Sequence, residues 1–253
     1  KPQTPTIVDP AGVKTGNAVR PMGQTTDTSR AETVDETGGL PRVDFENTSN
    51  PYIEYQNLDL LLTLQHPRSD AYDEMCFYIM GQVKELLFKS LHFELHNARH
   101  LICQGQLDDA LFIADRALEI TKLLTNAWDV VATVSAEGFN QFRNHLDEAS
   151  GQLSFMFRHV EFVLGNKDRR LASAHRNVPH VWPYMKEALE SPSLYDEVLR
   201  LLNRQGFEIA PEALERDWAD QYAPHESVEQ AWFDIISSPS TSSGLYKLGE
   251  VLV

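Results

Sequence analysis

The stretch DEMCFYIMGQVKELLFKSLHFELHNARHLIC, residues 73–103, decides the fold of this chain. Its apolar side chains recur at near-helical spacing, namely at Met75, Ile79, Leu86, Phe93 and Leu95. Glu85 and Lys89 stand four residues apart, which predicts an ion pair on one helix face. The first half is apolar on several sides, as in a fully buried helix. The stretch therefore predicts one long helix whose first half lies inside the protein.

Helical patterns continue on the carboxyl side of this stretch. After the break at Gly105, an apolar stripe follows residues 107–128, formed by Leu107, Ala110, Leu111, Ala114, Ala117, Leu118, Leu124 and Trp128. Three shorter helices are predicted by their caps: one from Ser135 to near Leu146, one over residues 155–164 closed by Gly165, and one from Ser193 to a stop at Gly206. Alternation typical of strands is nearly absent, so we expect an all-α fold built around long antiparallel helices.

Residues 1–48 differ in composition from the rest and predict a flexible tail, or an arm that orders on another subunit. Residues 49–253 are expected to form one all-α domain. The chain begins without methionine and stops within a helical pattern, so we expect its carboxyl-terminal part to be missing.

The charge of the chain excludes two classes of partner. Lys plus Arg is 22 against 37 for Asp plus Glu, a formal charge of −15. A nucleic-acid binder shows a basic face, and an anionic membrane surface attracts cations, so neither partner is expected. No segment is apolar enough to span a bilayer. Cys76 and Cys103 fall within helical patterns and suggest reduced thiols, hence a cytoplasmic protein.

Two groups of residues carry candidate chemistry. Arg143 follows Phe139 and Phe142 in the sequence FNQFR, and an arginine beside aromatic rings suits a planar carboxylate; the alternative is a surface arginine in a salt bridge. His92, His96 and His100 share one face of the long helix. Such a face can bind a metal ion, although a solvated polar stripe is the simpler interpretation.

A larger pattern covers about residues 50–253. It comprises Tyr52, Tyr55, Leu58, Asp73-Glu-Met75, Phe77, Gln82, Glu85-Leu86, Phe88-Lys89, Glu94-Leu95, Trp128, Phe139, Phe142-Arg143, Leu146, Ala149-Ser-Gly151, Phe157-Arg158, the run from Glu161 to Lys167, the run from Ala188 to Tyr195, and Arg216-Asp-Trp218. This pattern resembles the amino-terminal part of bacterial members of the tryptophan 2,3-dioxygenase superfamily. The resemblance implies an all-α homotetramer, an obligate oligomer with a helical-bundle fold, that holds one heme b per subunit and uses O₂ and a tryptophan-like amino acid.

The resemblance also implies roles for single residues. Arg143 would bind the substrate carboxylate, and the walls of the indole pocket would be Phe77, Phe139 and Leu146. Trp128, Ser150 and Gly151, together with Phe77, would border the heme. Tyr52 and Tyr55 would come from the arm of a neighbouring subunit and close its pocket. The heme-ligating histidine of the family would lie beyond the end of this chain, which itself shows no metal ligand.

One departure from the family's pattern falls at the catalytic position. The distal histidine of the dioxygenases, four residues after the pocket phenylalanine, is Gly81 here. Lys84 and Leu87 also stand where the family usually has other residues. We therefore expect a heme oxygenase of tryptophan or of a substituted tryptophan, in which Gly81 and Arg143 shape catalysis. A divergent member would form a 2-oxindole by adding one oxygen atom. The alternatives are an ordinary dioxygenase that forms N-formylkynurenine, a non-catalytic relative that binds aromatic amino acids, and a metal protein that uses the His92, His96 and His100 face.

Overall fold

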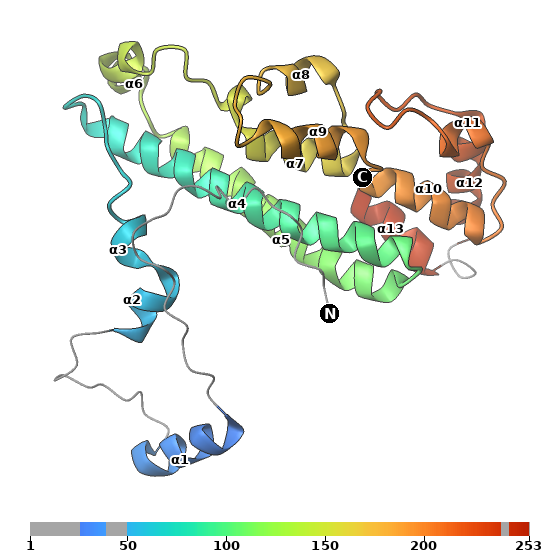
Figure 1. Cartoon of the computed structure of the whole chain (residues 1–253), viewed down its shortest axis with the longest axis horizontal. Coiled ribbons are helices and arrows are strands. Elements are labelled where there is room, and N and C mark those ends of the chain that lie inside the picture. Colours follow the sequence, from blue (N-terminus) through green and yellow to red (C-terminus); the bar gives the residue numbers. More distant parts are fainter. Residues whose placement is uncertain (1–25, 39–49, 239–242, 253) are drawn as a thin grey trace. The chain divides into compact units, whose positions relative to one another are not determined.

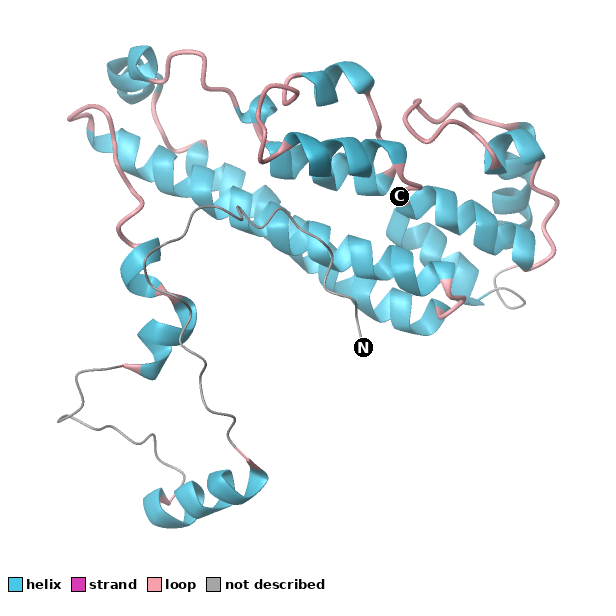
Figure 2. Ribbon diagram, viewed as in Figure 1, coloured by secondary structure: helices cyan, strands magenta, loops and turns pink. Residues whose placement is uncertain are grey.

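The structure, a computed structural model, describes residues 26–38, 50–238 and 243–252. In these ranges every regular element is a helix (Figure 2), which confirms the all-α prediction for the described residues. Contacts divide the chain into two units, Ala11–His66 and the remainder. No helix among the described residues is long and apolar enough to cross a membrane.

The smaller unit contains three short helices: α1 (Asp27–Thr37), α2 (Pro51–Gln56) and α3 (Leu58–Leu61). Thr26 caps α1 with a capping box, and the Asn50 side chain accepts hydrogen bonds at the start of α2. The predicted tail thus contains a helix at residues 27–37, while its residues 1–25 and 39–48 lie outside the described ones. The boundary near residue 48 stays a prediction.

The larger unit is built on two long helices, α4 (Tyr72–Cys103) and α5 (Leu107–Val131). They lie side by side and antiparallel (Figure 1), joined by a tight turn in which Gly105 adopts a φ of 78°. Only glycine takes this left-handed conformation without strain, so Gly105 ends the first helix. Most of the predicted α5 stripe is buried, but Leu118 and Trp128 are exposed.

Shorter elements follow α5: α6 (Ala136–Phe142), η1 (Arg143–His145), η2 (Gly151–Leu153), α7 (Phe155–Leu164), α8 (Arg169–Ser173), α9 (Trp182–Glu190), α10 (Leu194–Arg204), α11 (Pro211–Leu214), α12 (Glu226–Ser237) and α13 (Ser243–Leu252). The predicted caps are confirmed. Ser135 and Ser193 each accept a backbone hydrogen bond at a helix start, and Gly165 and Gly206 follow helices with positive φ. The helix predicted from Ser135 to near Leu146 is α-helical only as far as Phe142. It continues from Arg143 as a 3₁₀ turn that ends next to Leu146.

The main core lies where α7, α10 and α13 pack against the α4–α5 pair. A second apolar cluster joins α7, α8 and α9 around Phe162 and Met185, both fully buried. The fully buried Lys167 supports this region, because its ammonium donates to the carbonyl oxygens of Ala188, Leu189 and Ser191 at the end of α9. These bonds satisfy carbonyls that have no partner within the helix.

The prediction that the first half of α4 is fully buried is wrong for this chain. Among residues 72–90 only Glu74 is buried, and Leu86 is 52% exposed. The second half is covered, with Leu91, Leu95, Ala98 and Ile102 all buried. The physical reason is that α10 packs on the second half, while α6 covers only the beginning of the first.

The predicted ion pair on α4 is also wrong. No ion pair joins Glu85 to Lys89 in the described part of the chain. Glu85 interacts instead with Lys84 and accepts a hydrogen bond from Ser154. Burial outweighs both of these partners and raises the pKa of the Glu85 carboxyl.

Candidate functional site

Three phenylalanine rings gather at the start of α4. The Phe77 ring centroid lies 5.9 Å from that of Phe139 and 5.4 Å from that of Phe142, and the last two are 5.2 Å apart. Distances of this size are typical of tilted and edge-to-face aromatic contacts. Phe142 is completely buried, whereas Phe77 and Phe139 are only half-buried. The structure therefore brings together two of the predicted pocket residues, Phe77 and Phe139, with Phe142 behind them.

The helix that carries two of these rings is held against α4 at its own start. Ser135 caps α6 by accepting a hydrogen bond from the Gly138 amide at 2.9 Å. Gly138 is buried, and a Cβ atom at this position would lie 1.9 Å from Oδ2 of Asp73. With the Asp73 side chain in this position there is no room for a Cβ atom, so the glycine in Ala136-Glu-Gly138 lets α6 dock on the first turn of α4. This docking places Phe139 and Phe142 against Phe77.

Arg143 directly follows the aromatic cluster and begins the turn η1. Its side chain is exposed. In the described part of the chain no acceptor and no carboxylate pairs with its guanidinium. The predicted alternative is a surface or helix-end arginine in a salt bridge. Arg143 is exposed and lies at the end of α6, but it forms no ion pair among the described residues. Leu146, another predicted pocket residue, ends the same turn, is half-buried, and donates its amide to the carbonyl of Arg143 at 3.2 Å.

A loop before α4 is tied to the same turn, a feature that the sequence did not reveal. The buried carboxylate of Glu74 accepts hydrogen bonds from the amides of Arg68 and Ser69 and from the Ser69 hydroxyl. Burial acts to raise the pKa of Glu74, but these hydrogen bonds outweigh it and lower the pKa. Arg68 in turn donates to the carbonyl of His145 at 3.4 Å. Glu74 thus anchors a loop that reaches the turn bearing Arg143.

Gly81 lies one helical turn after Phe77 on α4. A Cβ atom built at Gly81 would meet no other atom within 4 Å outside the neighbouring helix backbone. The space beside Gly81 is therefore open. Phe77, Gly81, Lys84 and Phe88 lie on one side of the helix, which we call the Gly81 face. Phe88 closes its far end by packing on Phe157 of α7, with 5.3 Å between ring centroids.

Trp128 reaches the Gly81 face from α5. Its ring is 57% exposed, and Nζ of Lys84 lies 3.5 Å from the ring centroid. The two other residues predicted at the heme border, Ser150 and Gly151, form an exposed turn in which Ser150 caps η2. A Cβ atom at Gly151 would also meet no atom within 4 Å. Among the described residues, no hydrogen bond or ring contact joins this turn to Trp128.

Tyr52 and Tyr55 lie on α2, in the smaller unit, and their side chains are 67% and 71% exposed. Both rings are thus available to another molecule. Their predicted place in the pocket of a neighbouring subunit stays a prediction.

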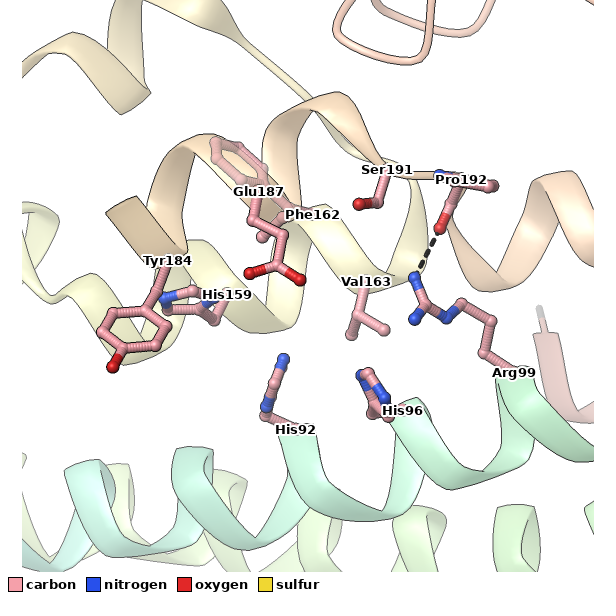
Figure 3. A pocket seen from close by; sticks show the side chains of 11 residues that line it. His92, His96, Arg99, His159, Phe162, Val163, Tyr184, Glu187, Ser191 and Pro192 are labelled. Carbon is pink, nitrogen blue, oxygen red and sulfur yellow. Dashed lines mark hydrogen bonds between the residues drawn. The ribbon is translucent and has the colours of Figure 1, made fainter. Parts of the chain in front are cut away.

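A separate pocket lies on the second half of α4, with about 500 Å³ of empty space that is partly open to solvent. It is lined by His92, His96, Arg99, His159, Phe162, Val163, Tyr184, Glu187, Ala188, Ser191 and Pro192. Figure 3 shows His92, His159 and the Glu187 carboxylate pointing toward one another, while Arg99 donates to the Pro192 carbonyl at 2.7 Å.

The histidines of this pocket are neutral. Burial, reinforced by the neighbouring His159, lowers the pKa of His92 to about 3, and burial lowers the pKa values of His96 and His159 to about 4. His100, the third member of the predicted metal face, does not line the pocket. Among the described residues no group of three His, Cys, Asp or Glu side chains is arranged to hold a metal ion. The His92, His96 and His100 face therefore does not bring three metal ligands together in the described part of the chain.

Comparison with known proteins gives consistent matches. The sequence profile of the family described as tryptophan 2,3-dioxygenase matches residues 37–189. The chain is 37% identical, over 212 residues, to the tryptophan 2,3-dioxygenases of Burkholderia cenocepacia and Burkholderia ambifaria, with 84% of this chain and 68% of each relative covered. The enzyme of Burkholderia mallei is equally similar, with 69% of its length covered.

An all-α fold, an aromatic site on a long helix and these matches together define the chain as a homologue of heme oxygenase enzymes. It belongs to the tryptophan 2,3-dioxygenase family.

Proposed function

We propose that this protein is a heme-dependent oxygenase that acts on L-tryptophan or a substituted tryptophan and adds oxygen from O₂ at the indole C2–C3 bond. The observation that carries the proposal is the Gly81 face, where open space adjoins an aromatic cluster that is followed at once by the unpaired Arg143. The names of the similar proteins support the same reaction class and substrate.

The substrate part of the site follows from charge and shape. Arg143 offers a planar, exposed guanidinium that can form two parallel hydrogen bonds to an amino-acid carboxylate. Phe77, Phe139 and Leu146 offer apolar walls for the indole ring. In a homotetramer, Tyr52 and Tyr55 of a neighbouring subunit would close this pocket, which gives their exposed rings a role.

The residues of the Gly81 face fit a heme. A porphyrin is a flat apolar ring with two carboxylates, and this face combines aromatic side chains, the open space at Gly81 and the ammonium of Lys84. Phe77 and Trp128 would border the ring, and Ser150 and Gly151 its edge. A bound heme would supply redox-active iron to this face.

Gly81 determines what the protein can do to the indole nitrogen. Glycine has no side chain to accept the indole N–H proton or to donate a hydrogen bond to oxygen. The open space instead gives room for a ring substituent. We therefore place this protein among oxygenases in which the substrate is oriented by Arg143 and the aromatic walls, without an acid or base at position 81.

The oxygen balance separates two versions of the reaction. Addition of both atoms of O₂ to the indole needs no other reactant and yields an N-formylkynurenine. Addition of one atom yields a 2-oxindole and requires two electrons and two protons from a reductant, or hydrogen peroxide as the oxidant. We propose the one-atom version for a substituted tryptophan, because the room at Gly81 suits a larger indole.

The test is an optical spectrum of the full-length protein with hemin, reduced without oxygen and then exposed to O₂ and substrate, with the product weighed by mass spectrometry. A Soret band and a product heavier by one oxygen atom, formed from O₂ in the presence of a reductant, support the proposal as stated. Formation of the same product with hydrogen peroxide alone would assign the oxygen atom to peroxide instead of O₂. A product heavier by two oxygen atoms contradicts the one-atom version but still supports the assignment as a heme-dependent oxygenase.

The second candidate function is a non-catalytic protein that binds an aromatic amino acid. Gly81 favours it, because a histidine is expected at that position in a catalytic member. Tight binding of L-tryptophan without a Soret band would establish this alternative and exclude the oxygenase.

A further inference from the structure

Lys84 is a cation whose closest recognised partner in the described part of the chain is an aromatic ring. It lies on the Gly81 face, and Nζ is 3.5 Å from the centroid of the Trp128 ring. In the described ranges of the chain, no carboxylate forms an ion pair with Lys84 and no oxygen accepts a hydrogen bond from it. Its immediate neighbour in the sequence, Glu85, interacts with it only electrostatically and is engaged with Ser154.

Its surroundings make this cation costly to leave unpaired. The Lys84 side chain is half-buried, and burial lowers the pKa of its ammonium against the smaller opposing effect of Glu85. Contact with an indole ring offsets part of the lost hydration. A ligand carboxylate would offset more, because a charged hydrogen bond is among the strongest that a protein makes.

Two cations that form no ion pair among the described residues lie near opposite ends of the Gly81 face. Arg143 follows the phenylalanine cluster that packs on Phe77. Lys84 lies seven residues after Phe77 on α4, which corresponds to a rise of about 10 Å along the helix axis. The open position Gly81 lies between Phe77 and Lys84. A single small amino acid needs one of these cations for its carboxylate. The second cation is then available to a second carboxylate, carried by a larger molecule.

We propose that Lys84 binds a carboxylate of the molecule that lies against the Gly81 face, and that this carboxylate is a propionate of heme. The inference rests on the proposed function, since it takes heme as the occupant. Lys84 then binds the cofactor on the side where Trp128 lies, while Arg143 binds the substrate. The other source of a carboxylate is the amino-acid substrate itself, and the experiment separates the two.

The experiment measures how fast the full-length protein, loaded with hemin, loses it to an excess of apomyoglobin. We expect Lys84→Met to lose hemin about ten-fold faster than the unchanged protein. Methionine keeps the apolar contact with Trp128 but carries no charge. Lys84→Arg should restore slow loss. Lys89→Met, which removes an exposed lysine of the same helix, is the matched control and should leave the rate unchanged.

A second arm uses hemin dimethyl ester, in which both propionates are blocked. With the ester, Lys84→Met and the unchanged protein should lose the cofactor at equal rates. Equal rates with ordinary hemin would overturn the inference and leave the proposed function intact. Unchanged hemin loss together with weaker binding of L-tryptophan would overturn the propionate assignment in favour of the substrate. Absence of a Soret band in the unchanged protein would overturn the proposed function itself, and the Lys84 inference with it.

Discussion

The two halves of α4 have opposite surroundings. Residues 91–103 are held in the core by α5, α7 and α10, and their apolar side chains are buried. Residues 72–90 are just as apolar, yet only Glu74 among them is buried, and Met75, Ile79 and Leu86 are exposed. The second half therefore supports the fold, while the first half leaves apolar side chains exposed, and we propose that other molecules bind there. The candidate site lies on the first half, around Gly81.

The largest expected difference between the halves is in stability, and two leucines of α4 measure it. Leu91→Ala removes a buried side chain and should lower the free energy of unfolding by about 2–5 kcal/mol. Leu86→Ala, at a position that is 52% exposed, should lower it by only about 0.5 kcal/mol. Denaturant unfolding of both variants measures these values. Equal losses would show that the first half is buried after all, for example within an oligomer.

Arg143, which follows the phenylalanine rings packed on the first half of α4, should have the largest effect on activity. Arg143→Met should lower kcat/KM for the amino-acid substrate about 100-fold, because the carboxylate loses two charged hydrogen bonds. Arg143→Lys, which keeps the charge but loses the planar geometry, should lower it about ten-fold. Steady-state kinetics measure both values, with Lys122→Met on the surface of α5 as the control. A full rate for Arg143→Met would remove the arginine from the site.

Lowering the pH should destabilise the protein through the histidines on the second half of α4. The pKa of His92 is lowered to about 3, so the folded protein binds fewer protons than the unfolded chain below about pH 6.5. The stability that His92 provides is present above that pH and is lost as the pH falls toward 3. Its loss between pH 7 and pH 5 should be about 2 kcal/mol. The groups facing His92 are His96, Arg99, His159 and Glu187.

The check on this effect is denaturant unfolding at several pH values. His92→Gln should reduce the loss of stability between pH 7 and pH 5 by about 2 kcal/mol, while the contributions of His96 and His159 remain, and Lys122→Met should not change it. An unchanged pH profile for His92→Gln would mean that this histidine is not held neutral by burial.

The smallest effects should come from two glycines that differ in their surroundings. Gly81→Ala should stabilise the protein by about 0.5–1 kcal/mol, since its Cβ atom meets open space and alanine favours a helix. Gly138→Ala should destabilise it by about 1 kcal/mol, because the Cβ atom would meet the Asp73 carboxylate. Thermal unfolding measures whether each variant is more or less stable than the unchanged protein. A destabilising Gly81→Ala would show that the space beside Gly81 is filled.

Much of the fold could be predicted from local signals. The caps Ser135 and Ser193 and the stop at Gly165 are short-range hydrogen-bonding and conformational effects, and they place helix ends correctly. The exposure of the first half of α4 could not be predicted. Periodicity shows that a face is apolar, but it does not show whether the same chain or another molecule covers it.

The candidate site was only partly accessible to sequence reasoning. The grouping of Phe77 with Phe139 was expected from the family resemblance, and the structure brings the two rings together. The contact between Lys84 and Trp128 joins residues far apart in sequence, and it depends on how α4 and α5 align. The hydrogen bonds that Glu74 accepts from the loop at Arg68 likewise depend on how this loop folds back onto α4, so no local sequence pattern predicts them.

Hydrogen exchange along α4, with and without hemin and L-tryptophan, tests the division between the two halves most directly. We expect hemin to slow exchange of the amides in residues 72–90 and to leave residues 91–103, already protected by the core, unchanged. Added L-tryptophan should extend the protection to α6 and the turn at Arg143. Protection confined to the histidine pocket on the second half, or none at all, would contradict the assignment of the site to the Gly81 face.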